Sequence, residues 1–532
     1  MSEKKEGSRR DFIKTAATGI VGLAVGAGIG YGASTMTAPA KPGATVTVTQ
    51  TAPGAALQFP FNLPRKGETP AERAINAANF LLQQHPEWKG TEIVLACVGG
   101  YQVGFDAMKS EWEQKTGTKV TCATTPLPDF FDKMMQEAVT KTGSIDLLNI
   151  QPMYLTDLVE AGMLYQLDDI AMWLDARLKG RPDGYIYPLQ ELTATYLGKT
   201  WGFTQDGDVT ITYYRKDLMN DPKEKEGFEK QYGYPLAPPK LITEYRDQAE
   251  YFYRPNKDMY GFVENREVTR NANMFYIYFN SKKWPNMYYF DDNMKPQLTT
   301  KEGIEAAKIY VEMVKYGPPG LIGMLGTANY NPFAEGKVFV SMNFPSMSNT
   351  IQSPQAKSKD KWDSAPPCGW MVDGPGGKKI LNRRGVLLAN WCLAVSNHSK
   401  KKELAACAAV YFADPENLVK AVITPATWHD MSRYNMVGAN ADPRVVAARG
   451  PLLTGYEEAA ELLTPMVSQM RGATEYNVSL SKNLHAAMSG TMDVVKALET
   501  TEKQWEELTE RLGREKQLAG WRRLKNLYST KA

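Results

Sequence analysis

The first clear pattern of apolar and polar positions in this chain begins at residue 92. A short β-rich run at 92–98 leads into the sequence GGY at 99–101. Beyond these residues, apolar side chains recur at Phe105, Met108 and Trp112, three and four residues apart. This is the spacing of one face of an α-helix, so the pattern predicts a strand, a glycine-rich loop and a helix.

The pattern returns from helix to strand within a few residues. Gly117 is suited to a helix C-terminus, and a second β-rich run follows at 119–123. The order strand, helix, strand predicts a parallel βαβ unit, and ligands of open α/β sheets bind at the carboxyl ends of the strands. We therefore expect Tyr101, which follows the first strand, to line a binding cleft.

The alternation continues along the chain. Residues 129–142 predict a helix and residues 145–150 a third strand, followed by a short helix over 155–160. Gln151 and Tyr154 come directly after the third strand. They share the expected sheet edge with Tyr101 and are candidates for the same cleft.

Length and composition limit the possible classes of protein. With 532 residues the chain exceeds the roughly 250 to 300 residues at which one hydrophobic core stops growing, so two or more lobes are expected. The hydrophobic fraction of 43% and charged fraction of 23% are near the average for globular proteins. The net charge is only +3, and residues 1–40 account for +2 of it, so no nucleic-acid partner is expected.

The amino-terminal segment has the character of an export signal. Arg9 and Arg10 precede Phe12 and a weakly apolar, Gly- and Ala-rich run, a pattern that resembles a twin-arginine signal. We interpret residues 1–34 as a signal peptide or retained anchor. The following residues, 35–87, are interpreted as a Thr-, Pro- and Ala-rich tether with a lead-in segment. The protein is then expected at the periplasmic or extracellular face of the cytoplasmic membrane.

Cysteine and histidine usage indicates no metal chemistry. The four histidines lack metal-ligand spacing, and the five cysteines contain no C-x-x-C pair. Cys97 and Cys122 fall in the first two predicted strands and could form one disulfide in an oxidising compartment. The alternative is that all five are buried free thiols, since Cys is often a small core residue. No metal and no other cofactor is expected.

Several motifs, in a shared order over about 430 residues, resemble the carbohydrate-type extracellular solute-binding proteins of ABC importers, the family that includes maltose-binding protein. The family's order of motifs is matched by AGML with LDD at 161–169, Trp201-Gly202-Phe203, the run 213–218, Glu335-Gly336-Lys337 with 338–343, the run 385–395, and 484–498 with Trp505.

The resemblance implies a hinged, two-lobed α/β fold of the periplasmic-binding-protein type II class, with a mixed sheet in each lobe. Residues 88–206 and 385–432 would form the first lobe, and residues 207–384 and 433–532 the second. The family binds its solute between the lobes, so ligand contacts are expected from both.

A sugar ligand needs flat aromatic surfaces and side chains that exchange hydrogen bonds with hydroxyl groups. Asp208 aligns with a sugar-binding acidic position of the family, and Ser346 replaces an expected stacking tryptophan, so maltose itself is not implied. The complete set of expected ligand-binding residues is Tyr101, Gln151, Tyr154, Asp206, Asp208, Glu264, Asn343, Phe344, Trp391 and Tyr476.

The resemblance implies a carbohydrate ligand, permease subunits as membrane partners, and a monomer without enzymatic activity. One alternative is a binding protein for another polar solute, such as a polyamine or a glycerol phosphate. A second alternative is a secreted glycoside hydrolase that uses Asp206 and Asp208 as acid and base. No second carboxylate motif of comparable strength accompanies this pair, which disfavours the hydrolase.

Overall fold

The computed structural model describes residues 63–386, 390–464 and 470–529. The predicted signal at 1–34 and the tether residues up to 62 lie outside the described residues. Within the described ranges, none of the helices combines the length and the apolar character that a membrane crossing requires.

The first lobe is organised around a five-stranded mixed sheet with the order β2-β1-β3-β14-β6. Strand β1 pairs in parallel with β2 and β3, whereas β14 is antiparallel to β3 and β6. The strands are β1 Glu92–Cys97, β2 Lys119–Thr124, β3 Leu147–Ile150, β6 Gly202–Thr204 and β14 Cys392–Val395. The predicted parallel βαβ unit is confirmed.

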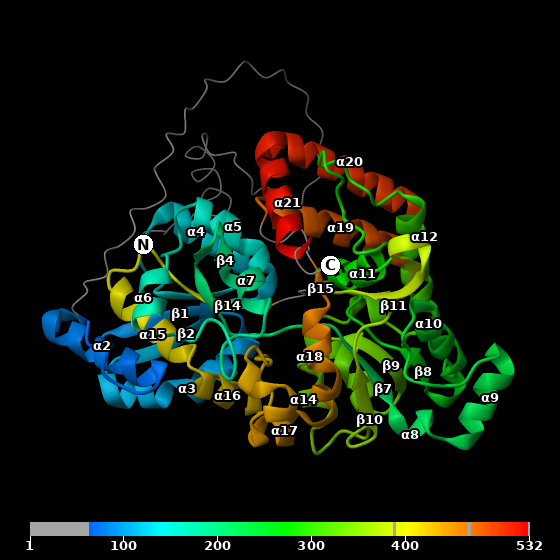
Figure 1. The fold of residues 1–532 in the computed structure, drawn as a ribbon, viewed down its shortest axis with the longest axis horizontal. Coiled ribbons are helices and arrows are strands. Elements are labelled where there is room, and N and C mark those ends of the chain that lie inside the picture. Colours follow the sequence, from blue (N-terminus) through cyan, green and yellow to red (C-terminus); the bar gives the residue numbers. More distant parts are fainter. Residues whose placement is uncertain (1–62, 387–389, 465–469, 530–532) are drawn as a thin grey trace, which may run out of the picture. The chain divides into compact units, whose positions relative to one another are not determined.

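Helices α2, α3, α15 and α16 pack together beside this sheet, although they come from distant parts of the chain. In Figure 1 the yellow α15 and α16 lie among blue elements from the start of the described chain. The first-lobe helices are α2 Pro70–Gln84, α3 Gly99–Thr116, α4 Leu127–Thr140, α5 Pro152–Glu160, α6 Asp168–Trp173, α7 Leu189–Ala194, α15 Lys402–Phe412 and α16 Pro415–Ile423. Helix α2, which falls in the lead-in segment, therefore belongs to the core of this lobe.

The second lobe contains a four-stranded mixed sheet with the order β10-β7-β9-β8. Strand β7 is antiparallel to β9 and β10, and β8 is parallel to β9. The strands are β7 Ile211–Arg215, β8 Tyr260–Phe262, β9 Val338–Asn343 and β10 Trp362–Ala365. The bounds of β9 match the run expected from the sequence.

The remaining elements surround this second sheet or connect the two lobes. Helices α11, α12, α19 and α20 pack against one another, as green and red-orange ribbons in Figure 1. The helices are α8 Lys216–Met219, α9 Pro222–Tyr232, α10 Ile242–Tyr251, α11 Asn271–Asn280, α12 Lys301–Glu312, α13 Asn331–Ala334, α14 Met347–Ile351, α17 Pro443–Arg449, α18 Leu453–Glu461, α19 Ala473–Met488, α20 Val494–Leu512 and α21 Arg514–Ser529. The exception is a hairpin in the first lobe, in which β4 Thr195–Tyr196 pairs with β5 Lys199–Thr200 beside α7. The other short strands are β11 Gly369–Asp373, β12 Lys379–Arg383, β13 Gly385–Val386 and β15 Leu463–Thr464.

The return of the chain to the first lobe differs from the expected single strand at 385–395. The structure has β13 paired with β15, and then β14 in the first sheet, with residues 387–389 outside the described part. Two short strands therefore replace the one that was expected, because the chain ends its pairing with β15 before it enters the five-stranded sheet as β14.

Cys97 and Cys122 are neighbours, as their predicted strands indicated. All five cysteines are free thiols in this structure. A hydrogen bond with Cys122, together with burial, raises the pKa of the Cys97 thiol.

Helix α5 of the first sheet's layer contacts the start of α19. The carboxylate of Asp157 accepts the backbone N–H of Gly472, with its two oxygens 3.1 and 3.3 Å from the nitrogen. Gly472 is the N-cap residue of α19, so the carboxylate satisfies the backbone N–H at the start of this helix, as the acidic residue of a capping box does. Burial nevertheless raises the pKa of Asp157 to about 6.

Because this pKa is raised, the contribution of Asp157 to the free energy of unfolding decreases as the pH rises, whereas an aspartate with a lowered pKa shows the opposite dependence. The native state holds the proton more tightly than the unfolded chain, so the contribution of Asp157 is complete below about pH 4 and is lost as the pH rises through about 6. Asp157→Asn keeps an acceptor and removes the charge. We expect the variant to exceed the wild type in unfolding free energy at about pH 8, by at most about 3 kcal/mol, and to show no gain at about pH 4.

The measurement is urea unfolding of both proteins across this pH range. Asp132→Asn, at an exposed position of α4, is the control for a simple loss of charge. A difference between wild type and Asp157→Asn that does not change with pH would contradict the prediction.

Candidate ligand-binding site

Three aspartates meet where the chain passes between the two sheets. Asp206 and Asp208 follow β6, and Asp430 follows α16. Their carboxylate oxygens lie within 4.8 Å of one another, and all three residues are buried. Gly207 permits this approach, because a Cβ at that position would lie 1.8 Å from the carbonyl oxygen of Met431. We call Asp206, Asp208 and Asp430 the aspartate cluster.

Neighbouring groups bind two members of the aspartate cluster firmly. The hydroxyl of Tyr101 donates to Oδ2 of Asp206 at 2.5 Å, and the backbone N–H of Asp430 donates to Oδ1 at 3.0 Å. Nη1 of Arg449 lies 3.1 Å from Oδ1 of Asp430. The same guanidinium donates to the carbonyl oxygens of Val422 and His429, which fixes its position.

Burial shifts the pKa of each aspartate upward. For Asp206 the pKa is raised first by burial and then by the charge of Asp430. For Asp208, burial and the charges of Asp206 and Asp430 raise the pKa, and the nearby Arg270 opposes them. Burial also raises the pKa of Asp430 despite its ion pair with Arg449. Like charges this close do not all ionise easily, so the aspartate cluster retains protons that exposed aspartates would lose.

Among the described residues, the aspartate cluster is the group whose spacing could suit a metal ion. Both oxygens of Asp206 already accept hydrogen bonds, and Asp430 is paired with an arginine. Carboxylates that coordinate a metal ion such as Ca²⁺ or Mg²⁺ use their oxygens as ligands of the ion. The arrangement is better suited to hydrogen bonds with hydroxyl groups than to a metal.

Aromatic rings cover one side of the aspartate cluster. The ring of Tyr101 lies 4.9 Å from that of Trp391 and 5.8 Å from that of Trp428. Tyr154 meets Trp391 edge to face at 6.4 Å. Gln151 is buried at the N-cap of α5, directly before Tyr154's helix turn. The structure thus brings five predicted residues together in one region. Three are aromatic residues of the first lobe, and two are members of the aspartate cluster: Tyr101, Tyr154, Trp391, Asp206 and Asp208.

Arg270 reaches this region from the second lobe, at the N-cap of α11. Its guanidinium carbon lies 5.4 Å from the ring centre of Phe344, a predicted site residue that follows β9. The charge of Arg270 acts on Asp208, Tyr101 and Tyr154, which places it beside residues of both lobes. No described residue forms a hydrogen bond or ion pair with its guanidinium.

The predicted residue Asn343 lies at the end of β9 within a chain of amide groups. Its Oδ1 accepts from Asn265 at 2.8 Å, and its Nδ2 donates to Asn329 at 2.7 Å. Its side chain also accepts the backbone N–H of Phe344 at 3.0 Å. These bonds hold the turn that carries Phe344, so Asn343 positions its neighbour.

The structure does not bring the predicted residues Glu264 and Tyr476 to the aspartate cluster. Glu264 is fully buried in an ion pair with Arg266 at 2.7 Å and accepts the hydroxyl of Tyr278. Tyr476 is a residue of α19 and faces the helices that follow, where its hydroxyl is hydrogen-bonded to Thr509 at 2.7 Å. Both side chains have partners within the core of the second lobe.

Sequence reasoning missed four residues of this region: Arg270, Trp428, Asp430 and Arg449. None of the four lies in a stretch with periodic apolar positions, and none belongs to the motifs from which the ten predicted site residues were chosen. The run Trp428-His429-Asp430, an aromatic and a charged residue in sequence, was the one local signal available.

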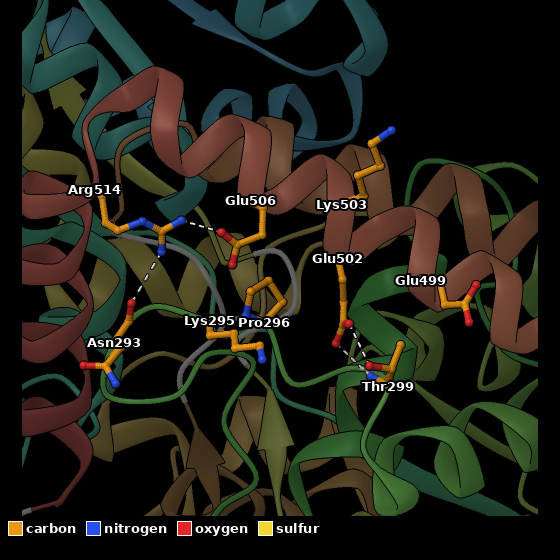
Figure 2. A pocket seen from close by; sticks show the side chains of 9 residues that line it. All are labelled: Asn293, Lys295, Pro296, Thr299, Glu499, Glu502, Lys503, Glu506 and Arg514. Carbon is orange, nitrogen blue, oxygen red and sulfur yellow. Dashed lines mark hydrogen bonds and ion pairs between the residues drawn. The ribbon is translucent and has the colours of Figure 1, made fainter.

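A separate pocket of about 600 Å³ lies between α20 and the loop that precedes α12. Figure 2 shows Glu502 directed at Thr299 and Arg514 at Glu506. The residues that line this pocket include none of the ten predicted site residues. Much of its charge is satisfied within the pocket, and we assign no ligand to it.

Comparison with known proteins agrees with this architecture. The family model described as "Bacterial extracellular solute-binding protein" matches residues 107–428, more than half of the chain. No curated protein sequence matches the chain significantly.

Solved structures share the fold. A ribitol complex of an ABC transporter solute-binding protein from Agrobacterium radiobacter K84 aligns with a TM-score of 0.63 at 18% identity, over 79% of this chain and 99% of that one. Maltose-bound MalE3 of T. maritima gives 0.63 at 19%, over 79% and 100%. A D-mannitol complex from Agrobacterium vitis S4 gives 0.64 at 20%, over 80% and 99%.

Two lobes with mixed sheets and a buried polar cluster where they meet define a type II periplasmic-binding fold, which confirms the expected fold class. The chain belongs to the family of bacterial extracellular solute-binding proteins.

The residues Gly99, Gly100 and Tyr101, expected as a loop, form the first turn of α3. This placement generates a test with a matched control. A Cβ at Gly100 would lie 1.9 Å from Cδ2 of Trp428, whereas a Cβ at Gly99 meets nothing within 4 Å. We expect Gly100→Ala to displace the indole and lower the unfolding free energy by about 1 to 3 kcal/mol.

Gly99→Ala should leave the unfolding free energy unchanged or raise it by up to about 1 kcal/mol, since alanine restricts the unfolded chain. Urea unfolding followed by tryptophan fluorescence measures both effects. Equal free energies for the two variants would show that the indole does not pack on Gly100.

Proposed function

We propose that this protein captures a sugar or polyol between its lobes and delivers it to the permease of an ABC importer. The observation that carries the proposal is the presence of both acceptors and a donor in one aromatic-lined region. The aspartate cluster accepts hydrogen bonds, and Arg270 can only donate them. A ligand with several hydroxyl groups satisfies both, because each hydroxyl donates and accepts.

The polyamine alternative fits this region less well. A polyamine carries donors alone, so it would leave Arg270 without an acceptor and bring cations next to its charge. The aromatic rings of Tyr101, Trp391 and Trp428 offer flat apolar surfaces of the kind that cover sugar faces. Relatives of the same fold support this choice, since their structures contain ribitol, maltose and D-mannitol.

The division into lobes that we propose is 88–206 with 385–432, and 207–384 with 433–532. Helix α2 packs on α15 and α3 and is added to the first lobe. The remaining ligand contacts stay with the predicted residues around the aspartate cluster, to which we add Asp430, Trp428 and Arg270.

Export by the twin-arginine route is part of the proposal and rests on Arg9 and Arg10. Arg9→Lys together with Arg10→Lys should keep the protein in the cytoplasm, because the route reads the arginine pair. Cell fractionation and amino-terminal sequencing measure this and show whether the signal is removed. Lys4→Arg with Lys5→Arg is the control. Normal export of the variant that carries both Arg9→Lys and Arg10→Lys would exclude the twin-arginine route.

Asp208 gives the sharpest test of sugar binding. A thermal-shift screen of sugars, polyols, polyamines and phosphates first identifies a ligand. A ligand hydroxyl left without its partner in a buried site costs roughly 1 to 3 kcal/mol, so Asp208→Ala should weaken that ligand about five- to more than a hundredfold. The melting temperature without ligand should not fall, because burial and nearby aspartates already disfavour the charged carboxylate.

Calorimetric titration and thermal melts of the same variant separate binding from folding. Asp373→Ala, at an exposed position of the β11–β12 hairpin, is the matched control. Unchanged affinity of Asp208→Ala, or a screen in which polyamines alone stabilise the protein, would refute the proposed function.

A further inference from the structure

Arg270 is a charged residue that is nine-tenths buried, and no described residue of opposite charge is in contact with it. Its exposed fraction is 9%. No described residue accepts a hydrogen bond from its guanidinium, whose carbon lies 5.4 Å from the centre of the Phe344 ring. Removing a charge from water costs several kcal/mol unless other groups replace the lost hydrogen bonds. The described residues alone do not supply that replacement.

The guanidinium groups of the other deeply buried arginines of the described chain all have hydrogen-bond or ion-pair partners, although Nε of Arg433 has none. Arg266 pairs with Glu264 at 2.7 Å. Arg433 donates to four backbone carbonyl groups, and Arg449 pairs with Asp430. Arg215 pairs with Asp217 at 2.6 Å. Arg270 is the exception among these five, and it lies in the region where a ligand is expected.

The groups around Arg270 do not provide an acceptor. Asp208 feels its charge but lies beyond ion-pair distance, since the two form no salt bridge. The hydroxyl of Tyr154, also influenced by this charge, makes no hydrogen bond to a described residue. The hydroxyl of Tyr330 is already shared with Ser346 at 3.0 Å. The part of the site around Arg270 therefore presents hydrogen-bond donors, whereas the aspartate cluster presents acceptors.

We propose that Arg270 binds an anionic group of the ligand, so that the captured solute is an acidic sugar or polyol that carries a carboxylate or a phosphate. This inference rests on the proposed function. A guanidinium forms two parallel hydrogen bonds with a carboxylate or phosphate, and such charge-assisted bonds are about twice as strong as neutral ones. The ligand's hydroxyl groups then donate to the aspartate cluster at the opposite end.

The test compares matched sugars on the full-length protein. Isothermal titration is carried out with D-glucose, D-glucuronate and D-glucose 6-phosphate, and with the corresponding three derivatives of D-galactose. At least one anionic member should bind about tenfold or more tightly than its neutral parent. The uronates and the 6-phosphates distinguish the two possible anionic groups, and acetate and inorganic phosphate show whether the anion alone suffices.

Variants of Arg270 connect this preference to the side chain. Arg270→Gln should weaken the anionic sugar by about ten- to a hundredfold, and the neutral parent by a clearly smaller factor, because glutamine still donates to a hydroxyl group but carries no charge. Arg270→Lys keeps the charge but not the forked geometry, so its affinity should be intermediate. Arg522→Gln, at an exposed position of α21, is the control for net charge.

Thermal melts without ligand separate binding from a structural role. Loss of a buried, unpaired charge should leave the melting temperature of Arg270→Gln unchanged or higher, whereas a structural arginine would lower it. The inference is overturned if the neutral sugars bind as tightly as the anionic ones, if no anionic sugar binds, or if Arg270→Gln keeps the preference. Binding of neutral sugars alone overturns this inference and leaves the proposed function standing, whereas binding of polyamines alone removes both.

Discussion

The candidate site depends on one close approach of two backbone segments. Gly207, between the two aspartates that follow β6, lies so near Met431 that any side chain would collide with its carbonyl oxygen. The hydroxyl of Tyr456 donates to the carbonyl oxygens of both residues and holds the segments together. This contact sets Asp206 and Asp208 against Asp430, and it explains why a cluster of like charges forms at a point where the chain crosses between sheets.

The surroundings make such a cluster tolerable. Arg449 neutralises Asp430, and Tyr101 donates to Asp206, so two of the three carboxylates have a fixed partner. Asp208 interacts with Asp206 and Asp430 but forms no ion pair with a described residue, since Arg270 acts on it only from a distance. Functional sites commonly keep a polar group that the fold leaves unsatisfied, because a ligand can then complete it. Among the described residues, Arg270 is such a group, and its charge acts on Asp208 in the same region.

The sequence predicted the regular parts of this structure well and the site only in part. Helical spacing at Phe105, Met108 and Trp112 located α3, and the β-rich run before it located β1, because local periodicity reflects burial of one face. Asp430 and Arg270 lie in aperiodic segments and meet Asp208 only through the tertiary fold, so no local pattern could indicate them. Glu264 follows a strand just as a ligand-binding residue would, but Arg266, two residues later, turns back to pair with it.

Two of the contacts between the lobes have a common electrostatic character. Asp157 at α19 and the aspartates after β6 are carboxylates whose pKa values burial raises, so joining these surfaces removes negative charge from water. Desolvation of this kind opposes closure unless new hydrogen bonds replace those to water. On the proposed function, ligand hydroxyl groups supply those bonds at the aspartate cluster, and the ligand also gives Arg270 an acceptor. Closure would then be favourable chiefly when the cleft is occupied, which is the property that a carrier must have to signal its load to a permease.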